Sequence, residues 1–283
     1  MPIFHNYATL SYNGQTAISN LVTGEIVASL RMTKTAVVDT YAPDGQITYA
    51  VSIVNAGGGD LTDLELSDDL GAYAFGGEML TPLRYAAGSA HCFVNGVQQD
   101  GLTVTAGPPL SITGIRVPAS GSALILYTAE VTAYAPMCSG GQIENTATLS
   151  GTGITEPLTA SASVTPECSA ELNITKTLSP LTVTESGEIT YTFMITNLGG
   201  QATRSIDNAV VSDTFDPVIH DISVTLDGQS LTADQYSYDA LGGAFATSPG
   251  VITVPAAEFA QDPENGIWSR SPGMTVLQIT GKV

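Results

Sequence analysis

Basic residues are scarce in this chain of 283 residues, which has eight Lys and Arg together against 27 Asp and Glu. The formal net charge of −19 repels nucleic acid and anionic membrane surfaces, so we expect neither as a partner. The sequence has no apolar run long enough to span a bilayer, so we expect no membrane insertion. Helix-length amphipathic patterns are missing too, which argues against a helical or an α/β fold.

The motifs that carry common enzymatic chemistry are also lacking. The sequence has no Gly-x-Ser-x-Gly, no His-Glu-x-x-His and no phosphate-binding loop. Its three histidines are scattered without metal-ligand spacing. The dispersed loop carboxylates are more typical of a solvated acidic surface than of calcium ligands. We therefore expect no enzyme, no metal and no cofactor.

Cysteine is limited to three residues, Cys92, Cys138 and Cys168. Cys138 and Cys168 are symmetric about residues 152–154, where a hairpin would turn, and a regular hairpin would bring them within reach of a disulfide. Two unpaired surface thiols are the alternative, because the register of a hairpin is not fixed by its sequence. Cys92 is expected to be a small buried apolar side chain.

The residues that are abundant favour β-structure. Short runs of alternating apolar and polar residues are separated by turn signals such as Asn13-Gly14 and Asn95-Gly96. This pattern predicts an all-β sandwich, with helix confined to short turns, for example around residues 256–261.

The second half of the chain repeats the order of the first. Four segments recur: 30–35 as 172–177, 46–55 as 188–197, 64–70 as 209–215, and 122–131 as 274–283. Repetition on this scale predicts two tandem domains, residues 28–168 and 169–283, joined near Pro166.

One segment breaks the repeat. Residues 143–150 close the first half, and their copy is found at residues 4–11 instead of after residue 283. Residues 1–27 are therefore predicted to be a donor strand or hairpin, and domain 169–283 is predicted to be incomplete until a neighbour supplies these residues.

These repeats resemble a family of bacterial surface domains called the conserved repeat domain, or domain of unknown function eleven. The motifs that carry the resemblance are Thr-Lys-Thr at 33–35 and 175–177, Ile-Thr-Tyr at 47–49 and 189–191, the run 210–217, and Asn-x-Ala-Thr at 6–9 and 145–148. The resemblance implies tandem immunoglobulin-like sandwiches on a bacterial surface, with a structural or adhesive role, and it does not imply a catalytic activity. We expect a location on the outside of a cell or spore, with any leader either removed or not required, because the first residues lack leader features.

Lysine is the informative residue type, because only Lys34, Lys176 and Lys282 occur and the first two hold equivalent positions. Strand alternation turns Lys34 and Lys176 inward among apolar neighbours. The same alternation turns Asp68 and Asn145 inward. The corresponding residues of the other repeat are Asp213 and, from the donor segment, Asn6.

An inward Lys, Asp and Asn can form an isopeptide bond. A deprotonated lysine attacks the carboxamide, and an acid kept protonated by burial shuttles protons as ammonia leaves. The set resembles the Lys-Asn crosslinks of Gram-positive pilins and adhesins, and the candidates are Lys34–Asn145 with Asp68, and Lys176–Asn6 with Asp213. A buried ion pair without a bond is the alternative. Asn55 and Asn197 are competing acceptors, or residues that end their strands with side-chain turns.

These observations predict a filament subunit that polymerises head to tail with copies of itself. The donor residues Phe4, Asn6, Ala8 and Leu10 would fill the groove of the next subunit. The alternative is an adhesin or surface-layer fragment that binds an external ligand and has no need of complementary ends.

Overall fold

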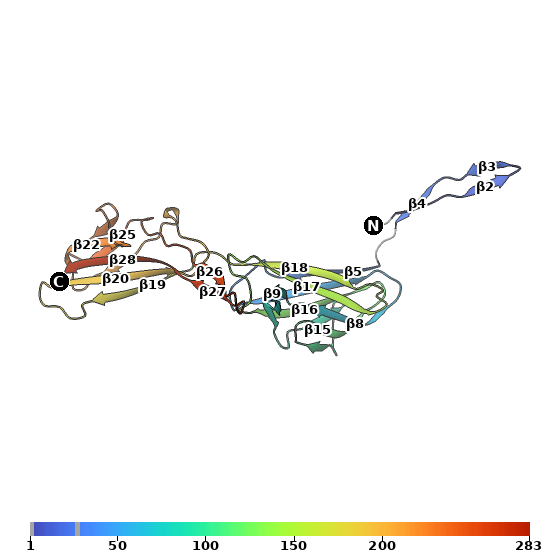
Figure 1. Ribbon diagram of the computed structural model, residues 1–283, viewed down its shortest axis with the longest axis horizontal. Coiled ribbons are helices and arrows are strands. Elements are labelled where there is room, and N and C mark those ends of the chain that lie inside the picture. The colour runs from blue at the N-terminus through green and yellow to red at the C-terminus, as the bar shows by residue number, and fades with distance from the viewer. Residues whose placement is uncertain (1–2, 26–28) are drawn as a thin grey trace. The chain divides into compact units, whose positions relative to one another are not determined.

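The computed structural model describes residues 3–25 and 29–283, in which the regular secondary structure is almost wholly β-strand (Figure 1). The one helical element among the described residues is the 3-10 turn η1 (Ser205–Asp207). The structure thus confirms the predicted all-β class. None of the helical residues described here forms a span long and apolar enough to cross a bilayer. The chain divides into two compact units, one of residues up to Thr132 with Ile143–Val164, the other of Ala133–Gln142 with Thr165–Val283.

The first unit is a sandwich of two antiparallel sheets. In spatial order, the first sheet contains β13 (Val97–Gln99), β12 (His91–Val94), β16 (Gly121–Val131), β7 (Gln46–Asn55) and β5 (Leu30–Ala36), with β11 (Leu83–Tyr85) also paired to β16. The second contains β14 (Thr103–Thr105), β15 (Leu110–Val117), β8 (Leu61–Asp68), β17 (Ile143–Thr152), β18 (Leu158–Pro166) and β6 (Thr40–Tyr41). A small hairpin joins β9 (Tyr73–Phe75) to β10 (Glu78–Leu80).

The core of the first unit lies between the inner faces of these sheets. Burial alternates along β7, β16 and β17, as expected when one face of each strand packs on the opposite sheet. Every second residue of β17 from Ile143 to Leu149 is buried, which agrees with the predicted inward face. β17 pairs with β8 and β18 and also contacts β5 in the other sheet. It therefore closes the sandwich over β5.

The second unit has the same plan with fewer strands. Its larger sheet contains β19 (Leu172–Ser179), β20 (Glu188–Asn197), β28 (Gly273–Lys282), β22 (His220–Leu226) and β23 (Gln229–Ser230). Its smaller sheet contains β21 (Ser212–Thr214), β25 (Ala244–Thr247) and β24 (Tyr236–Tyr238). These correspond to β8, β15 and β14 of the first unit. Within the described ranges 3–25 and 29–283, nothing corresponds to β17 and β18 and no strand pairs the other edge of β21.

Two predictions need correction. The segment expected to form a short helix, 256–261, contains the strand β26 (Glu258–Gln261), which pairs with β27 (Trp268–Ser271) around a turn. The predicted domain boundary at 168/169 also differs from the observed division, because residues 133–142 and 165–168 group with the second unit. The Cys138–Cys168 disulfide and backbone hydrogen bonds such as Trp268 N to Ala133 O hold these segments there. The other predicted boundary, at 27/28, lies outside the described residues.

The N-terminal residues form a two-stranded antiparallel ribbon (Figure 1). β1 (Ile3–Asn6) pairs with β4 (Val22–Glu25), and β2 (Thr9–Tyr12) pairs with β3 (Gln15–Ile18) around a turn at Asn13-Gly14. Asn13 and Gly14 both have positive φ, as a two-residue hairpin turn requires. All side chains of residues 3–23 are exposed. We call this ribbon, residues 3–25, the N-terminal hairpin.

Candidate functional site

A buried ion pair lies at the centre of the first unit. Lys34 Nζ donates to Asp68 Oδ2 over 2.6 Å, and the two side chains are 0% and 1% exposed. Lys34 comes from β5 and Asp68 from the end of β8, so the pair connects the two sheets of the sandwich. The structure therefore brings together the lysine and the aspartate that strand alternation turned inward.

Asp68 is held by contacts on both carboxylate oxygens. Its Oδ1 accepts the backbone N–H of Leu70 at 3.0 Å. Its Oδ2 accepts the hydroxyl of Tyr127 at 2.5 Å in addition to the Lys34 ammonium. Three donors fix this carboxylate in one orientation, as a buried charge requires.

Asn145 enters the same cluster through Tyr127. Its Nδ2 donates to the Tyr127 hydroxyl at 3.2 Å, and the residue is 0% exposed. The backbone next to it is pinned by Asp69, whose Oδ1 accepts the N–H of Thr146 at 2.9 Å and that of Gly71 at 2.8 Å. Asp69 N also donates to Thr146 O. The turn after β8 thus fixes β17 at the point where it presents Asn145.

Two atoms of this cluster are buried without a hydrogen-bond partner among the described residues, Asn145 Oδ1 and the hydroxyl of Tyr49. Tyr49 stacks on Tyr127, with ring centroids 5.5 Å apart, and its ring lies 4.9 Å from Lys34 Nζ. Burial raises the pKa of Tyr49, and the nearby Asn145 carboxamide partly offsets that rise. Neither tyrosine was singled out from the sequence. The sequence signal that could have identified them is strand alternation, which places both tyrosines on inward faces. A buried tyrosine hydroxyl generally requires a hydrogen-bond partner.

Burial sets the protonation of the cluster. Desolvation lowers the pKa of Lys34 below its ordinary value of 10.5, and the charge and hydrogen bond of Asp68 only partly oppose that effect. Burial and the neighbouring Asp68 raise the pKa of Tyr127 well above 10.0, so its hydroxyl keeps its proton. The site thus offers a lysine that loses its proton readily, a carboxylate in contact with it, and a carboxamide one phenol away. These are the groups that lysine–asparagine condensation requires.

The second unit contains the same pair in an open setting. Lys176 Nζ donates to Asp213 Oδ2, but the side chains are 39% and 19% exposed. The ammonium lies 4.4 Å from the ring centroid of Tyr191 and 5.4 Å from those of Phe193 and Phe215. Aromatic faces thus surround Lys176 on the side of its own unit. No asparagine of the described residues is hydrogen-bonded to this pair.

Two differences separate the sites. Leu172 and Ile174 lie on the same inward face of β19 as Lys176, and they remain 43% and 49% exposed. The corresponding strand of the first unit, β5, is covered by β17. The position of Tyr127 is also changed. Tyr127 pairs with Tyr49 across β16 and β7, and the residue opposite Tyr191 on β28 is Ile279.

The predicted donor residues lie in the N-terminal hairpin, and all of them are exposed. Phe4 and Leu10 are 52% and 67% exposed, and Asn6 and Ala8 are exposed as well. Asn6 is opposite Val22, and Leu10 is opposite Ala17. Between them the ladder is interrupted, whereas β17 pairs with β18 without a break from Ile143 to Leu149.

Asn55 and Asn197 organise loops at the ends of β7 and β20. Asn55 accepts the N–H of Gly57 and donates to the carbonyls of Gly59 and Pro118. Asn197 accepts the N–H of Gly199 and donates to Gln201 and Pro255. Both carboxamides are fully engaged, and Asn55 lies opposite Leu30, four residues along β5 from Lys34. The structure therefore gives them the strand-ending role and not that of crosslink acceptors.

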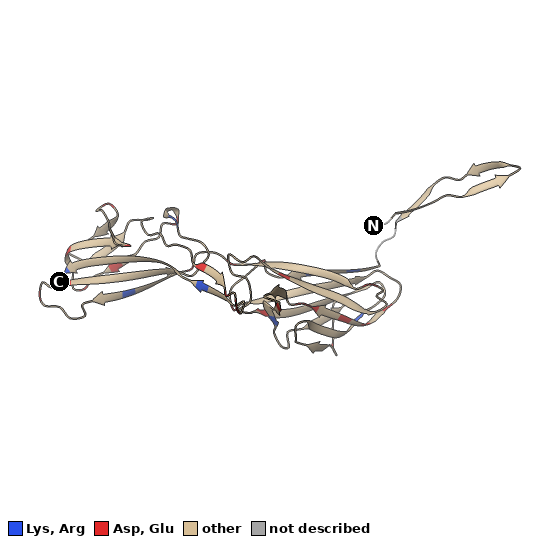
Figure 2. Cartoon of the chain, viewed as in Figure 1, with Lys and Arg blue, Asp and Glu red and all other residues tan. Residues whose placement is uncertain are grey.

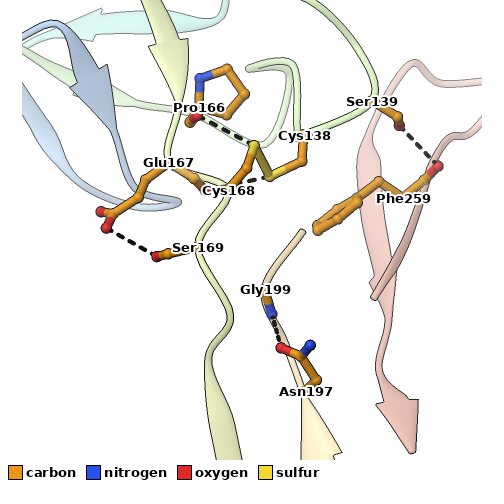
Figure 3. Close-up of a disulfide and its surroundings, with 9 residues drawn as sticks. All are labelled: Cys138, Ser139, Pro166, Glu167, Cys168, Ser169, Asn197, Gly199 and Phe259. Carbon is orange, nitrogen blue, oxygen red and sulfur yellow. Dashed lines mark hydrogen bonds between the residues drawn. A yellow bond between two sulfur atoms is a disulfide. The ribbon is translucent and has the colours of Figure 1, made fainter. Parts of the chain in front are cut away.

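Cys138 and Cys168 are joined by a disulfide with a Cα–Cα distance of 5.6 Å (Figure 3). Figure 3 also shows the hydrogen bond from the Ser139 hydroxyl to Phe259 O, which links this region to β26. Cys92 is a free, buried cysteine, and burial raises the pKa of its thiol to about 11. Within the part of the chain that the structure describes, His, Cys, Asp and Glu side chains form no group of three that could hold a metal ion.

Positions occupied by Lys and Arg are sparse along the chain (Figure 2). Apart from the two inward lysines, the described ion pairs are exposed ones: Arg84–Glu130, Arg270–Glu171 and Lys282–Asp221. Such pairs contribute little to stability. The Lys34 cluster is therefore the one closed ionic site among the described ion pairs.

No protein-family model matches the sequence, and no curated protein matches it. Among solved structures, the major pilin subunit of Bacillus cereus is similar at 12% identity and a TM-score of 0.37, covering 98% of this chain and 74% of that one. The pilus backbone protein of Streptococcus pneumoniae is similar at 11% identity and a TM-score of 0.36, covering 87% of this chain and 55% of that one. A collagen-binding domain from a Staphylococcus aureus adhesin is similar at 11% identity and a TM-score of 0.30, covering 49% of this chain and 99% of that one. The chain thus spans about half the length of the pilus backbone structure, and similarity at this level carries no conclusion about function.

Proposed function

We propose that this chain is a structural subunit of a surface filament, in which the N-terminal hairpin of one copy completes the second unit of the next. The observation that carries the proposal is the uncovered face of the second unit. Lys176 is 39% exposed where Lys34 is 0% exposed, and β21 has an unpaired edge where β8 pairs with β17. An open edge beside exposed apolar side chains is a site for strand addition.

The N-terminal hairpin has the chemistry of the missing part. Residues 4–11 repeat the pattern of residues 143–150, with Asn6, Ala8 and Leu10 in the places of Asn145, Ala147 and Leu149. Residues 3–24 contain no Asp, Glu, Lys or Arg, although the chain carries a net charge of −19. The hairpin can therefore enter an apolar groove without burying a charge.

The first unit supplies the expected register. There Ala147 pairs with Asp68, which places Asn145 beside the cluster. By the same register Ala8 of one copy pairs with Asp213 of the next, and Asn6 reaches the Lys176–Asp213 pair. Main-chain hydrogen bonds supply affinity, and the inward side chains set the register.

Assembly of this kind does not close on itself. Each subunit donates at the hairpin and accepts at the second unit, so the contact joins two different surfaces. Repeating such a heterologous contact gives an open filament. The same contact buries the face of β19 that carries Leu172 and Ile174.

Crosslinking strengthens the fibre within each subunit and between subunits. In the first unit Lys34 condenses with Asn145, assisted by Asp68, and one ammonia is lost. Between subunits, Asn6 meets the equivalent pair, and Lys176 condenses with it in the same way. Once a covalent bond has formed, the resistance of the fibre to force and proteolysis no longer depends on strand pairing alone.

The setting of such a filament is the outside of a bacterial cell or spore. A Cys138–Cys168 disulfide persists in oxidising surroundings. The strong negative charge keeps an exported protein soluble until it assembles. The resemblance of the repeats to the conserved repeat domain family supports this proposed location.

Electron microscopy and detergent resistance test the proposal together. Purified chain should form fibres, and deletion of residues 1–27 should give soluble monomers. Asn6→Ala should still give fibres, because strand addition is retained, but these should dissociate in hot detergent. Fibres from the deleted chain would contradict the donor hairpin, and wild-type fibres that dissociate in detergent would remove only the covalent part.

A further inference from the structure

The position of the Tyr127 hydroxyl in the closed site is defined by a simple hydrogen-bond argument. A phenol has one proton to donate, and Tyr127 gives it to Asp68 Oδ2 at 2.5 Å. Towards Asn145 the same oxygen can therefore only accept. This requires the carboxamide nitrogen, and not its oxygen, to face the phenol, as it does at 3.2 Å.

The atom that faces Tyr127 is the one that leaves during crosslinking. Breakage of the Cγ–Nδ2 bond of Asn145 requires a proton on Nδ2, because an amide anion is a very poor leaving group. Asp68 makes no direct hydrogen bond to Asn145 in the described structure. The hydrogen-bonded path from the carboxyl group to Nδ2 passes through the Tyr127 oxygen.

We propose that Tyr127 is a catalytic residue of the crosslinking reaction, relaying a proton from Asp68 to the departing nitrogen of Asn145. This inference rests on the proposed function, since it concerns the bond between Lys34 and Asn145. It assigns the phenol a task that neither the lysine nor the aspartate performs by itself.

The relay balances as follows in atoms and protons. One proton moves from the Lys34 ammonium to Asp68 along their 2.6 Å hydrogen bond, which leaves a neutral amine and a protonated acid. The amine attacks Cγ of Asn145, forming the Nζ–Cγ bond and opening the carbonyl. Asp68 gives its proton to Tyr127 as Tyr127 gives its own to Nδ2. The Cγ–Nδ2 bond then breaks, the carbonyl re-forms and ammonia leaves. Of the two protons on Nζ, one passes to Asp68 and the other stays on the new amide.

The second unit offers a comparison for the relay, because it has no tyrosine at the position that corresponds to Tyr127. The residue opposite Tyr191 is Ile279, where Tyr127 is opposite Tyr49. The rings around Lys176 belong to Tyr191, Phe193 and Phe215, and none of these described residues donates a hydroxyl hydrogen bond to Asp213. The Lys34–Asn145 bond should therefore form faster than the Lys176–Asn6 bond. This difference should remain after two subunits have associated, a step that only the second bond requires.

The test is a time course of ammonia loss in newly made full-length chain. Cell-free synthesis followed by intact-mass measurement at intervals gives the rate in the first unit, with Asn6→Ala present throughout to remove the second reaction. Tyr127→Phe keeps the ring and removes the hydroxyl, and it should slow the reaction on the order of a hundredfold, the usual contribution of a positioned proton donor. Tyr85→Phe is the matched control, since Tyr85 is a buried residue whose hydroxyl accepts the N–H of Ala90 and is not hydrogen-bonded to the described residues of the cluster. It should react at the wild-type rate.

A second measurement guards against misfolding of Tyr127→Phe. Site-specific incorporation of difluorotyrosine at position 127 keeps the hydroxyl and makes it more acidic, which should accelerate the reaction, whereas the same replacement at position 85 should not. Equal rates of ammonia loss for Tyr127→Phe and Tyr85→Phe would overturn the relay but not the crosslink. A rate that is unchanged by fluorination at position 127 would do the same. A parent chain that keeps its full mass would overturn the relay and the crosslink together.

Discussion

Lys34 Nζ lies 2.6 Å from Asp68 Oδ2 in a pocket that leaves the two side chains 0% and 1% exposed. The equivalent pair, Lys176 and Asp213, is in contact too, yet these side chains remain 39% and 19% exposed. The pairs occupy corresponding strands, so the difference in exposure reflects what covers them. In the first unit the cover is β17, and in the second unit we assign that place to a neighbour's hairpin.

The first prediction concerns the mass of the mature chain. The first unit should lack one ammonia relative to the sequence, and Lys34→Ala or Asp68→Ala should restore the full mass of that unit. Lys282→Ala should not, because its ion pair with Asp221 is exposed. Fragment mass spectrometry should locate the bond between the peptides that carry Lys34 and Asn145. An uncrosslinked Lys34 peptide in mature protein would leave only the ion pair.

The pH dependence of crosslinking follows from the lowered pKa of Lys34. The relay needs the one proton that Lys34 and Asp68 share, so its rate should fall as pH rises through the lowered pKa of Lys34, with a midpoint below 10.5, the ordinary lysine value. Timed mass measurements across pH give this profile. A midpoint at or above the ordinary value would show that Lys34 is not desolvated when it reacts.

Stability should follow the same titration in a chain that cannot crosslink. With Asn145→Ala present, the folded form binds fewer protons at Lys34 than the unfolded form does between the lowered pKa and 10.5. The contribution of Lys34 to the free energy of unfolding therefore increases with pH in that window. Denaturant titrations with and without Lys34→Met measure it as a difference in pH slope. Equal pH slopes of the unfolding free energy would contradict a lowered pKa of Lys34 in the folded chain.

Loss of the buried lysine should be far more costly than loss of an exposed one. In the Asn145→Ala background, Lys34→Ala leaves Asp68 buried without its partner and should cost about 3–5 kcal/mol of unfolding free energy. Lys282→Ala removes an exposed pair and should cost less than about 1 kcal/mol. Urea denaturation of both variants makes the comparison. Similar small losses would mean that Asp68 is reached by water.

Much of this architecture was readable from strand alternation. Inward parity placed Lys34, Asp68 and Asn145 in one core, because a two-residue period assigns faces without knowledge of the partner sheet. Parity gives no distances, which is why Tyr127 was missed as the link between Asp68 and Asn145. The strand β26 was also missed, since a short segment such as Glu258–Gln261 has too few residues to distinguish a strand from a helical turn.

The disulfide should stabilise the chain mainly by restricting its unfolded form. It closes a loop with a sequence separation of 30, for which chain entropy gives about 3–4 kcal/mol. Cys138→Ser together with Cys168→Ser should lower the free energy of unfolding by roughly that amount in non-reducing conditions. The paired variant should become insensitive to added reductant. Cys92→Ala is the control. Because the Cys92 thiol is free, this substitution should leave the sensitivity to reductant unchanged.

The central claim, that one copy's hairpin completes another copy's second unit, is tested most directly by mixing two chains that are each deficient at one end. The acceptor-only chain lacks residues 1–27, and the donor-only chain carries Ile174→Asp, which places a charge on the exposed inner face of β19. Light scattering after size-exclusion chromatography should show that each variant is a monomer alone. Mixed, they should form a one-to-one heterodimer and nothing larger, because only one donor and one acceptor remain. The absence of a heterodimer, or polymers from the chain without residues 1–27, would contradict the account.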